Sequence, residues 1–196
     1  MPDKRTIQII ITGFGGQGIV MAGDILGKAA TIYDGKHATM AQNYGPEARG
    51  GACSSQVIIS PEEILFPYVE EPEILICMSQ EAYTKNVKSL RADGTLIWDT
   101  DLVHTRKTDM HFKTFHIPAT RFAEKLGNKM MANIVMLGFV SAVDHLVHAE
   151  ALKKAIGDSV PPSTKEKNIQ AFTTGREYGN SIVKGLLKLE QAKHQD

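Results

Sequence analysis

The stretch IQIIITGFGGQGIVMAGDILGKA, residues 7–29, decides the fold of this chain. It opens with a run rich in β-branched residues, which is typical of a strand, and then passes through a cluster of glycines at residues 13–18. A helical pattern of apolar residues follows at once. Strand, glycine turn and helix in this order form the first half of a nucleotide-binding βαβ unit.

Each glycine of the turn has an expected task. Gly13 is expected to permit a tight turn off the strand, and Gly18 to let the helix pack closely on that strand. Gly15 and Gly16 leave the backbone open to a ligand. Because the unpaired N–H groups and the positive end of the helix face this loop, the sequence predicts a site for a phosphate or diphosphate. The alternative is a glycine turn that only shapes a close contact between strand and helix.

The composition narrows the class of protein. The 196 residues suffice for one α/β domain, residues 1–196, and they carry 22 basic and 22 acidic side chains. A net charge of zero argues against a nucleic-acid binder or a membrane-surface binder. The two cysteines, Cys53 and Cys77, cannot by themselves hold an iron–sulfur cluster or a structural zinc ion, and are expected to be small buried residues. No signal peptide or membrane span is evident, so the expected compartment is the cytoplasm.

The remaining pattern completes the expected architecture. It predicts a Rossmann-like, mainly parallel sheet flanked by helices, with a helical C-terminal third. Strands are expected at residues 37–41, 54–60, 73–78, 95–99 and, as a half-buried edge strand, 111–117, and helices at 18–33, 79–93, 120–126, 129–146, 150–156 and 163–187. Gly175, Gly179 and Gly185 lie inside the last helix, where they are expected to allow close packing on a neighbour.

The fingerprint of an NAD site is incomplete. Such a site needs an acidic residue at the end of the second strand to bind the ribose hydroxyls, but residues 39–42 read Thr-Met-Ala-Gln. A P-loop is excluded because Gly18 is not followed by Lys-Ser or Lys-Thr. The diphosphate ligands that remain include coenzyme A.

Residues 42–51 form a polar, glycine-rich segment that predicts a loop. Arg49 could pair with a phosphate or carboxylate, and Gly50 and Gly51 would keep the backbone open beside it. The alternative is a solvated arginine in a surface loop, paired locally with Glu47. The chain has no nucleophile elbow and no HExxH motif, so the residues alone predict binding of a phosphorylated ligand without catalytic machinery.

These motifs carry a family resemblance. The chain resembles the gamma subunit of the 2-oxoacid:ferredoxin oxidoreductases in the turn at residues 13–18, in the loop YGPEARGG at residues 44–51, and in the helix NKMMANIVMLG at residues 128–138. A looser match covers residues 165–175. The sequence of the second motif is most similar to that of the 2-oxoglutarate type, and the pyruvate and 2-oxoisovalerate types share most of its residues.

The resemblance implies a reaction in which a 2-oxoacid, coenzyme A and oxidised ferredoxin give an acyl-CoA, carbon dioxide and reduced ferredoxin. It implies alpha, beta and often delta subunits as partners, with thiamine diphosphate and iron–sulfur clusters on those partners. This chain would line the coenzyme A and substrate site, hold no metal and supply no catalytic residue. Alternatives are a stand-alone nucleotide- or CoA-binding module, an NAD-linked oxidoreductase and an indolepyruvate-type subunit. The expected ligand-binding residues are Gly13, Gly15, Gly16, Gln17, Gly18, Tyr44, Arg49, Gly50 and Gly51.

Overall fold

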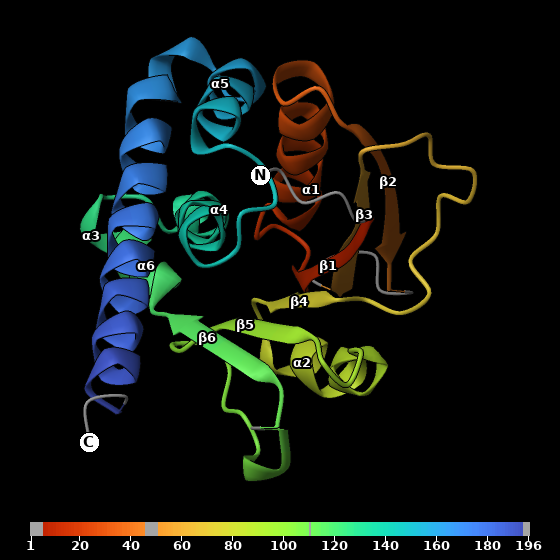
Figure 1. Cartoon of the computed structure of the whole chain (residues 1–196). Coiled ribbons are helices and arrows are strands. Elements are labelled where there is room, and N and C mark those ends of the chain that lie inside the picture. The colour runs from red at the N-terminus through yellow and green to blue at the C-terminus, as the bar shows by residue number, and fades with distance from the viewer. Residues whose placement is uncertain (1–5, 46–50, 110, 194–196) are drawn as a thin grey trace.

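The computed structural model describes residues 6–45, 51–109 and 111–193 (Figure 1). Within these residues one six-stranded sheet has the order β2-β3-β1-β4-β5-β6. Its strands are β1 (Ile7–Phe14), β2 (His37–Tyr44), β3 (Ala52–Ser60), β4 (Ile74–Cys77), β5 (Thr95–Asp99) and β6 (Lys113–Ile117). The predicted edge strand near residues 111–117 is confirmed, because β6 is the last strand in the order.

The sheet is mainly parallel, as predicted. β1 pairs with β4, β4 with β5 and β5 with β6 in parallel, whereas β3 is antiparallel to both β1 and β2. β2 therefore runs parallel to β1, but β3 lies between them. The hairpin that joins β2 to β3 is closed by a hydrogen bond from the Gly45 N–H to the Ala52 carbonyl, 2.6 Å long.

Helices cover the two faces of the sheet unequally (Figure 1). The α-helices are α1 (Ile19–Lys28), α2 (Gln80–Asn86), α3 (Ala119–Lys125), α4 (Ala132–Val143), α5 (Ala149–Ser159) and α6 (Lys165–Lys193). A π-helical turn, Ala29–Tyr33, prolongs α1, so the predicted first helix is confirmed over its length. α1, α3, α4, α5 and α6 pack around one large core on one face, and α2 packs over a smaller core on the other.

The centre of the large core is α4, which is buried at all twelve positions because it lies beneath α6. Glycines make this contact possible. A Cβ on Gly175 of α6 would lie 2.8 Å from the carbonyl carbon of Val135, and one on Gly179 would lie 2.7 Å from the Cβ of Ala142. The predicted close packing is confirmed at these two glycines. It is wrong for Gly185, because a Cβ there would meet none of the described residues within 4 Å.

The predicted end of the second strand is wrong. The second strand was expected to end at Ala41 and a loop to begin at Gln42, but β2 continues through Tyr44, which pairs with Cys53 of β3. The polar composition of residues 42–44 misleads because β2 is an edge strand, whose side chains meet water, while its pairing with β3 holds the backbone extended.

The two cysteines are buried, as predicted. Cys77 pairs with Thr12 of β1, and Cys53 pairs with the next residue, Gly13. Because successive strand residues point to opposite faces, the two thiols lie on opposite sides of the sheet. Burial raises the pKa of both thiols. Among the described residues, no helix is long and apolar enough to cross a membrane.

Candidate functional site

The glycine turn lies at the point where the chain changes from one face of the sheet to the other. After β1 the chain enters α1 on the face of the large core, and after β4 it enters α2 on the opposite face. β1 and β4 are parallel neighbours, so their carboxyl ends meet at one edge of the sheet. Open α/β sheets bind ligands in the crevice at such a switch point.

The turn begins at Gly15, two residues later than expected, because β1 continues through Phe14. Gly13 was expected to make the tight turn, but it belongs to β1 and pairs with Cys53. Its lack of a side chain serves packing, because a Cβ there would lie 2.8 Å from the Cδ1 of Ile19. The reversal of the chain falls on Gly16 and Gly18, whose φ angles of +91° and +72° favour glycine. A Cβ on Gly16 would meet none of the described residues within 4 Å.

Gln17 braces the turn from within. Its Oε1 accepts a hydrogen bond from the Phe14 N–H at 2.6 Å, and its Nε2 donates to the carbonyl of Met78 at 2.8 Å. The Gln17 N–H donates to the Phe14 carbonyl at 3.2 Å. Both ends of the side chain and the backbone donor are therefore engaged inside the protein. Gln17 ties the end of β1 to the residue that follows β4.

Several backbone donors of the turn remain available to a ligand. Among the described residues, the N–H groups of Gly16, Gly18 and Ile19 have no acceptor, and α1 has no side-chain cap. Ala22 donates the first helical hydrogen bond, to the Gly18 carbonyl at 2.9 Å. The free donors and the positive end of α1 favour an anion at this place.

Gly18 packs against a different element from the one expected. It was expected to bring α1 close to the strand, but a Cβ there would lie 2.9 Å from the Cγ of Asn133 on α4. Asn133 is buried, and its Nδ2 donates to the Gly18 carbonyl at 3.0 Å. The close approach of α1 to the sheet falls on Gly23, where a Cβ would lie 2.8 Å from the Cβ of Ser55 on β3.

The base of the predicted loop also touches the turn. The Gly15 N–H donates to the Gly51 carbonyl at 3.0 Å, so these two predicted ligand-binding glycines are adjacent. Tyr44 ends β2 with 66% of its surface exposed, and its hydroxyl donates to Oε1 of Gln42 at 3.0 Å. Arg49 and Gly50 lie outside the described residues.

Asn133 is the residue that reasoning from single motifs missed. It lies in the middle of the motif at residues 128–138, and it holds the glycine turn at residues 13–18 by its hydrogen bond to Gly18. Asn128 of the same motif accepts a hydrogen bond from the Met130 N–H at 3.0 Å and so caps the helical turn before α4. The signal in the sequence was an asparagine inside an apolar helix, which needs a polar partner when buried.

A buried carboxylate at the same edge of the sheet has a structural role. Asp99 ends β5 fully buried, and it accepts hydrogen bonds from the Thr120 hydroxyl at 2.7 Å and from the N–H groups of Thr120 and Asp101 at 2.8 and 2.9 Å. Burial raises the pKa of Asp99 despite these donors. The contacts tie β5 to the start of α3. Within the described part of the chain, no three His, Cys, Asp or Glu residues gather as a metal site.

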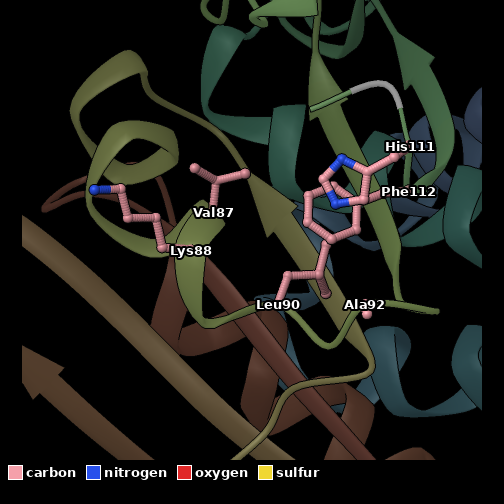
Figure 2. Close-up of a pocket in the computed structure, with 6 residues that line it drawn as sticks. All are labelled: Val87, Lys88, Leu90, Ala92, His111 and Phe112. Atoms are coloured by element: carbon pink, nitrogen blue, oxygen red, sulfur yellow. The ribbon is translucent and has the colours of Figure 1, made fainter. Parts of the chain in front are cut away.

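A pocket of about 310 Å³ lies away from the glycine turn (Figure 2). Its lining comes from the end of the α2 region and from the chain just before β6, as Val87, Lys88, Leu90, Ala92, His111 and Phe112. These residues precede β5 and β6, whereas the glycine turn follows β1. In a parallel sheet the pocket therefore lies at the opposite edge from the turn, and it is separate from the predicted ligand site.

Comparison with known proteins identifies the family. Residues 8–178 match the family described as pyruvate ferredoxin/flavodoxin oxidoreductase. The chain belongs to this family. Within it, the chain is 48% identical over 181 residues to the 2-oxoglutarate synthase subunit KorC of Methanocaldococcus jannaschii, covering 91% of this chain and 97% of that protein. The resemblance found in the sequence motifs is thus confirmed over nearly the whole length.

Solved structures of the family have the same fold. A gamma subunit of a keto/oxoacid ferredoxin oxidoreductase from Geobacter sulfurreducens matches with a TM-score of 0.77 at 36% identity, over 89% of this chain and 99% of that one. A 2-oxoglutarate:ferredoxin oxidoreductase from Magnetococcus marinus, with 2-oxoglutarate, coenzyme A and succinyl-CoA bound, matches with a TM-score of 0.83 at 20% identity. That match covers 91% of this chain and 32% of the larger chain, and it shows the shared fold.

Proposed function

We propose that this chain is the gamma subunit of a 2-oxoacid:ferredoxin oxidoreductase of the 2-oxoglutarate type. The enzyme would convert 2-oxoglutarate, coenzyme A and oxidised ferredoxin to succinyl-CoA, carbon dioxide and reduced ferredoxin. The observation that carries the proposal is the end-to-end identity of 48% with a 2-oxoglutarate synthase subunit. Bound to partner subunits, thiamine diphosphate supplies the decarboxylation chemistry and iron–sulfur clusters carry the electrons.

The task of this chain is to hold the diphosphate of coenzyme A. The free N–H groups of Gly16, Gly18 and Ile19 point to an anion beside the positive end of α1. None of the described residues lies within 4 Å of where a Cβ on Gly16 would be, so a ligand can approach its backbone without meeting any of their side chains. Gly13, Gly15 and Gln17 act through packing and internal hydrogen bonds, which hold the shape of the turn.

The loop at residues 44–51 supplies the second part of the site. Its last residue, Gly51, touches Gly15 of the turn, and Arg49 stands two residues earlier in the sequence. A guanidinium group beside the turn would pair with a phosphate of coenzyme A or with the substrate carboxylate. Tyr44 and Gly50 would complete the loop, which would extend toward the thiamine cofactor on a partner subunit.

The competing functions differ in testable ways. An NAD-linked enzyme would need an acid beside the turn at the end of the second strand, but in this fold β3 lies between β1 and β2. A stand-alone CoA-binding module would purify without cluster-bearing partners. A subunit of the pyruvate, 2-oxoisovalerate or indolepyruvate type would give an assembled enzyme with a different preferred oxoacid.

The test of the coenzyme A role uses the assembled enzyme. Gln17→Glu keeps an acceptor for the Phe14 N–H but removes the donor to Met78 and places a negative charge in the turn. We expect the KM for coenzyme A to rise at least tenfold, because a like charge beside a phosphate is repulsive. Gln170→Glu, on the exposed face of α6, adds the same charge at a distance and is expected to leave this KM unchanged.

Arg49→Ala tests the loop independently. The proposal predicts a higher KM for coenzyme A or for 2-oxoglutarate, with assembly intact. Unchanged constants for both substrates in Arg49→Ala would refute the role of the loop, and an unchanged KM for coenzyme A in Gln17→Glu would refute the role of the turn.

A further inference from the structure

The connection between β3 and β4 exposes an unusual group of apolar side chains. Leu65 is 89% exposed, Phe66 55% and Tyr68 58%. They follow one another in the sequence LFPY, residues 65–68, which we name the apolar spur. Figure 1 shows this connection as a long gold loop that projects beyond β2 and β3, away from α6. Contiguous exposed apolar groups of this kind mark interaction sites.

The apolar spur has a defined conformation without regular secondary structure. The rings of Phe66 and Tyr68 pack edge to face, with centroids 5.5 Å apart. Immediately after it, the N–H groups of Val69 and Glu70 donate to the side chains of Gln56 and Gln8, at 3.4 and 2.8 Å. The loop is therefore tied to β3 and β1 at its base while its apolar tip meets water. A preformed tip loses little conformational freedom on binding.

Charges of one sign surround the spur. Glu62 and Glu63 precede it and Glu70 and Glu71 follow it, and all four side chains are exposed. Residues 61–73 contain no lysine or arginine. Among the described residues none of these four carboxylates forms an ion pair. The surface is thus an apolar centre with an acidic rim.

We propose that the apolar spur docks into an apolar groove, bordered by lysine or arginine side chains, on another subunit of the same enzyme. The negative charge around the apolar spur indicates which kind of partner binds it. An anionic membrane surface would repel the four carboxylates, and a second copy of this chain would bring two acidic rims together. A basic rim on a different protein complements both the charge and the exposed apolar area. This inference rests on the proposed function, because it assigns a surface to the assembly of that enzyme.

The test measures assembly of the full chain with co-expressed partner subunits. Leu65→Ser/Phe66→Ser removes the apolar tip at exposed positions, so the urea midpoint of the isolated chain should not change. Binding to the partner subunits should weaken at least thirtyfold, as for truncated aromatic anchors at the centre of an interface. Ile32→Ser, at a residue that is 64% exposed elsewhere on the chain, is the matched control and should assemble as wild type does.

Charge reversal examines the rim separately. Glu70→Lys/Glu71→Lys should weaken binding at low salt and flatten its salt dependence, whereas Glu124→Lys on α3 should do neither. Wild-type assembly with thiamine- and cluster-bearing partners tests the proposed function itself. If the wild-type chain assembles, two results would overturn the docking role of the apolar spur. One is that Leu65→Ser/Phe66→Ser binds the partner subunits as tightly as wild type does. The other is that Ile32→Ser loses as much affinity for them as Leu65→Ser/Phe66→Ser. Self-association or vesicle binding that depends on Leu65 and Phe66, without loss of assembly, would also overturn it.

Discussion

The contact between α4 and α6 can be tested with two glycines of the same helix. Gly175 lies where α6 crosses α4, and Gly185 lies two to three turns further along, in open space. Alanine is the better helix former by up to about 1 kcal/mol at an interior position. Helix propensity alone therefore predicts that Gly175→Ala and Gly185→Ala stabilise the chain equally.

Packing reverses this expectation at Gly175. A Cβ there would lie 2.8 Å from the carbonyl carbon of Val135 and 3.0 Å from the backbone nitrogen of Phe139, with the Val135 oxygen closer still. An ordinary van der Waals contact of a Cβ is 3.4–4 Å long. Because both neighbours are backbone atoms, no rotamer change can relieve the overlap, and the two helices must move apart. Overpacking of a rigid backbone contact costs about 3 kcal/mol, the upper end of the usual range, and the gain in helix propensity offsets about 1 kcal/mol of it, so the net destabilisation should be about 2 kcal/mol.

Urea unfolding of the isolated chain measures both changes. With a slope of about 2 kcal/mol per molar urea, Gly175→Ala should lower the midpoint by about 1 M. Gly185→Ala should leave the midpoint unchanged or raise it by up to about 0.5 M. A midpoint for Gly175→Ala within experimental error of wild type would refute the packing of α6 on α4. Equal destabilisation by both substitutions would refute the reasoning as well.

Three further predictions concern charge, the turn and the thiols. Burial alone would raise the pKa of Asp34, but the hydrogen bond from His148 and the ion pair with Lys36 outweigh it and hold that pKa below its usual range. The stabilisation by Asp34 is therefore fully present above about pH 4 and is lost progressively as the pH falls toward the lowered pKa, so Asp34→Asn should lower the urea midpoint more at pH 7 than at pH 3. Gln17→Ala should destabilise the chain by about 1–3 kcal/mol in the same assay, because the Phe14 N–H and the Met78 carbonyl both lose a partner. Cys77, which is fully buried with a raised pKa, should react with a thiol reagent only in urea, and rapid labelling of the native chain would contradict its placement.

The sequence predicts the local elements of this fold well because their signals are local. The β-branched run before Gly13, the glycine cluster and the apolar period of α1 each depend on a few neighbouring residues. Strand direction is different. The pattern of residues 54–60 indicates a strand but cannot tell that β3 inserts between β1 and β2 in antiparallel orientation. That outcome depends on pairing between segments, which also explains why β2 runs past its predicted end.

The candidate site likewise has features that a local sequence motif predicts and features that depend on distant segments. The free N–H groups and the positive φ of Gly16 and Gly18 follow from the glycine motif itself. The partner of Gly18 does not, because Asn133 is 115 residues away in the sequence. The brace between Gln17 and Met78 spans 61 residues and is equally invisible to a local reading. Long-range contacts therefore assign Gln17 and Gly18 their tasks, whereas short-range chemistry predicts where an anion would bind.

We propose above that this chain completes a coenzyme A-dependent 2-oxoglutarate:ferredoxin oxidoreductase. The most direct measurement is ferredoxin reduction by the enzyme reconstituted from its purified subunits, with and without this chain. We predict reduction that requires 2-oxoglutarate, coenzyme A and this chain together, and that is slower with pyruvate. Equal rates when the chain is omitted would contradict the claim, as would a chain that never associates with the thiamine- and cluster-bearing subunits.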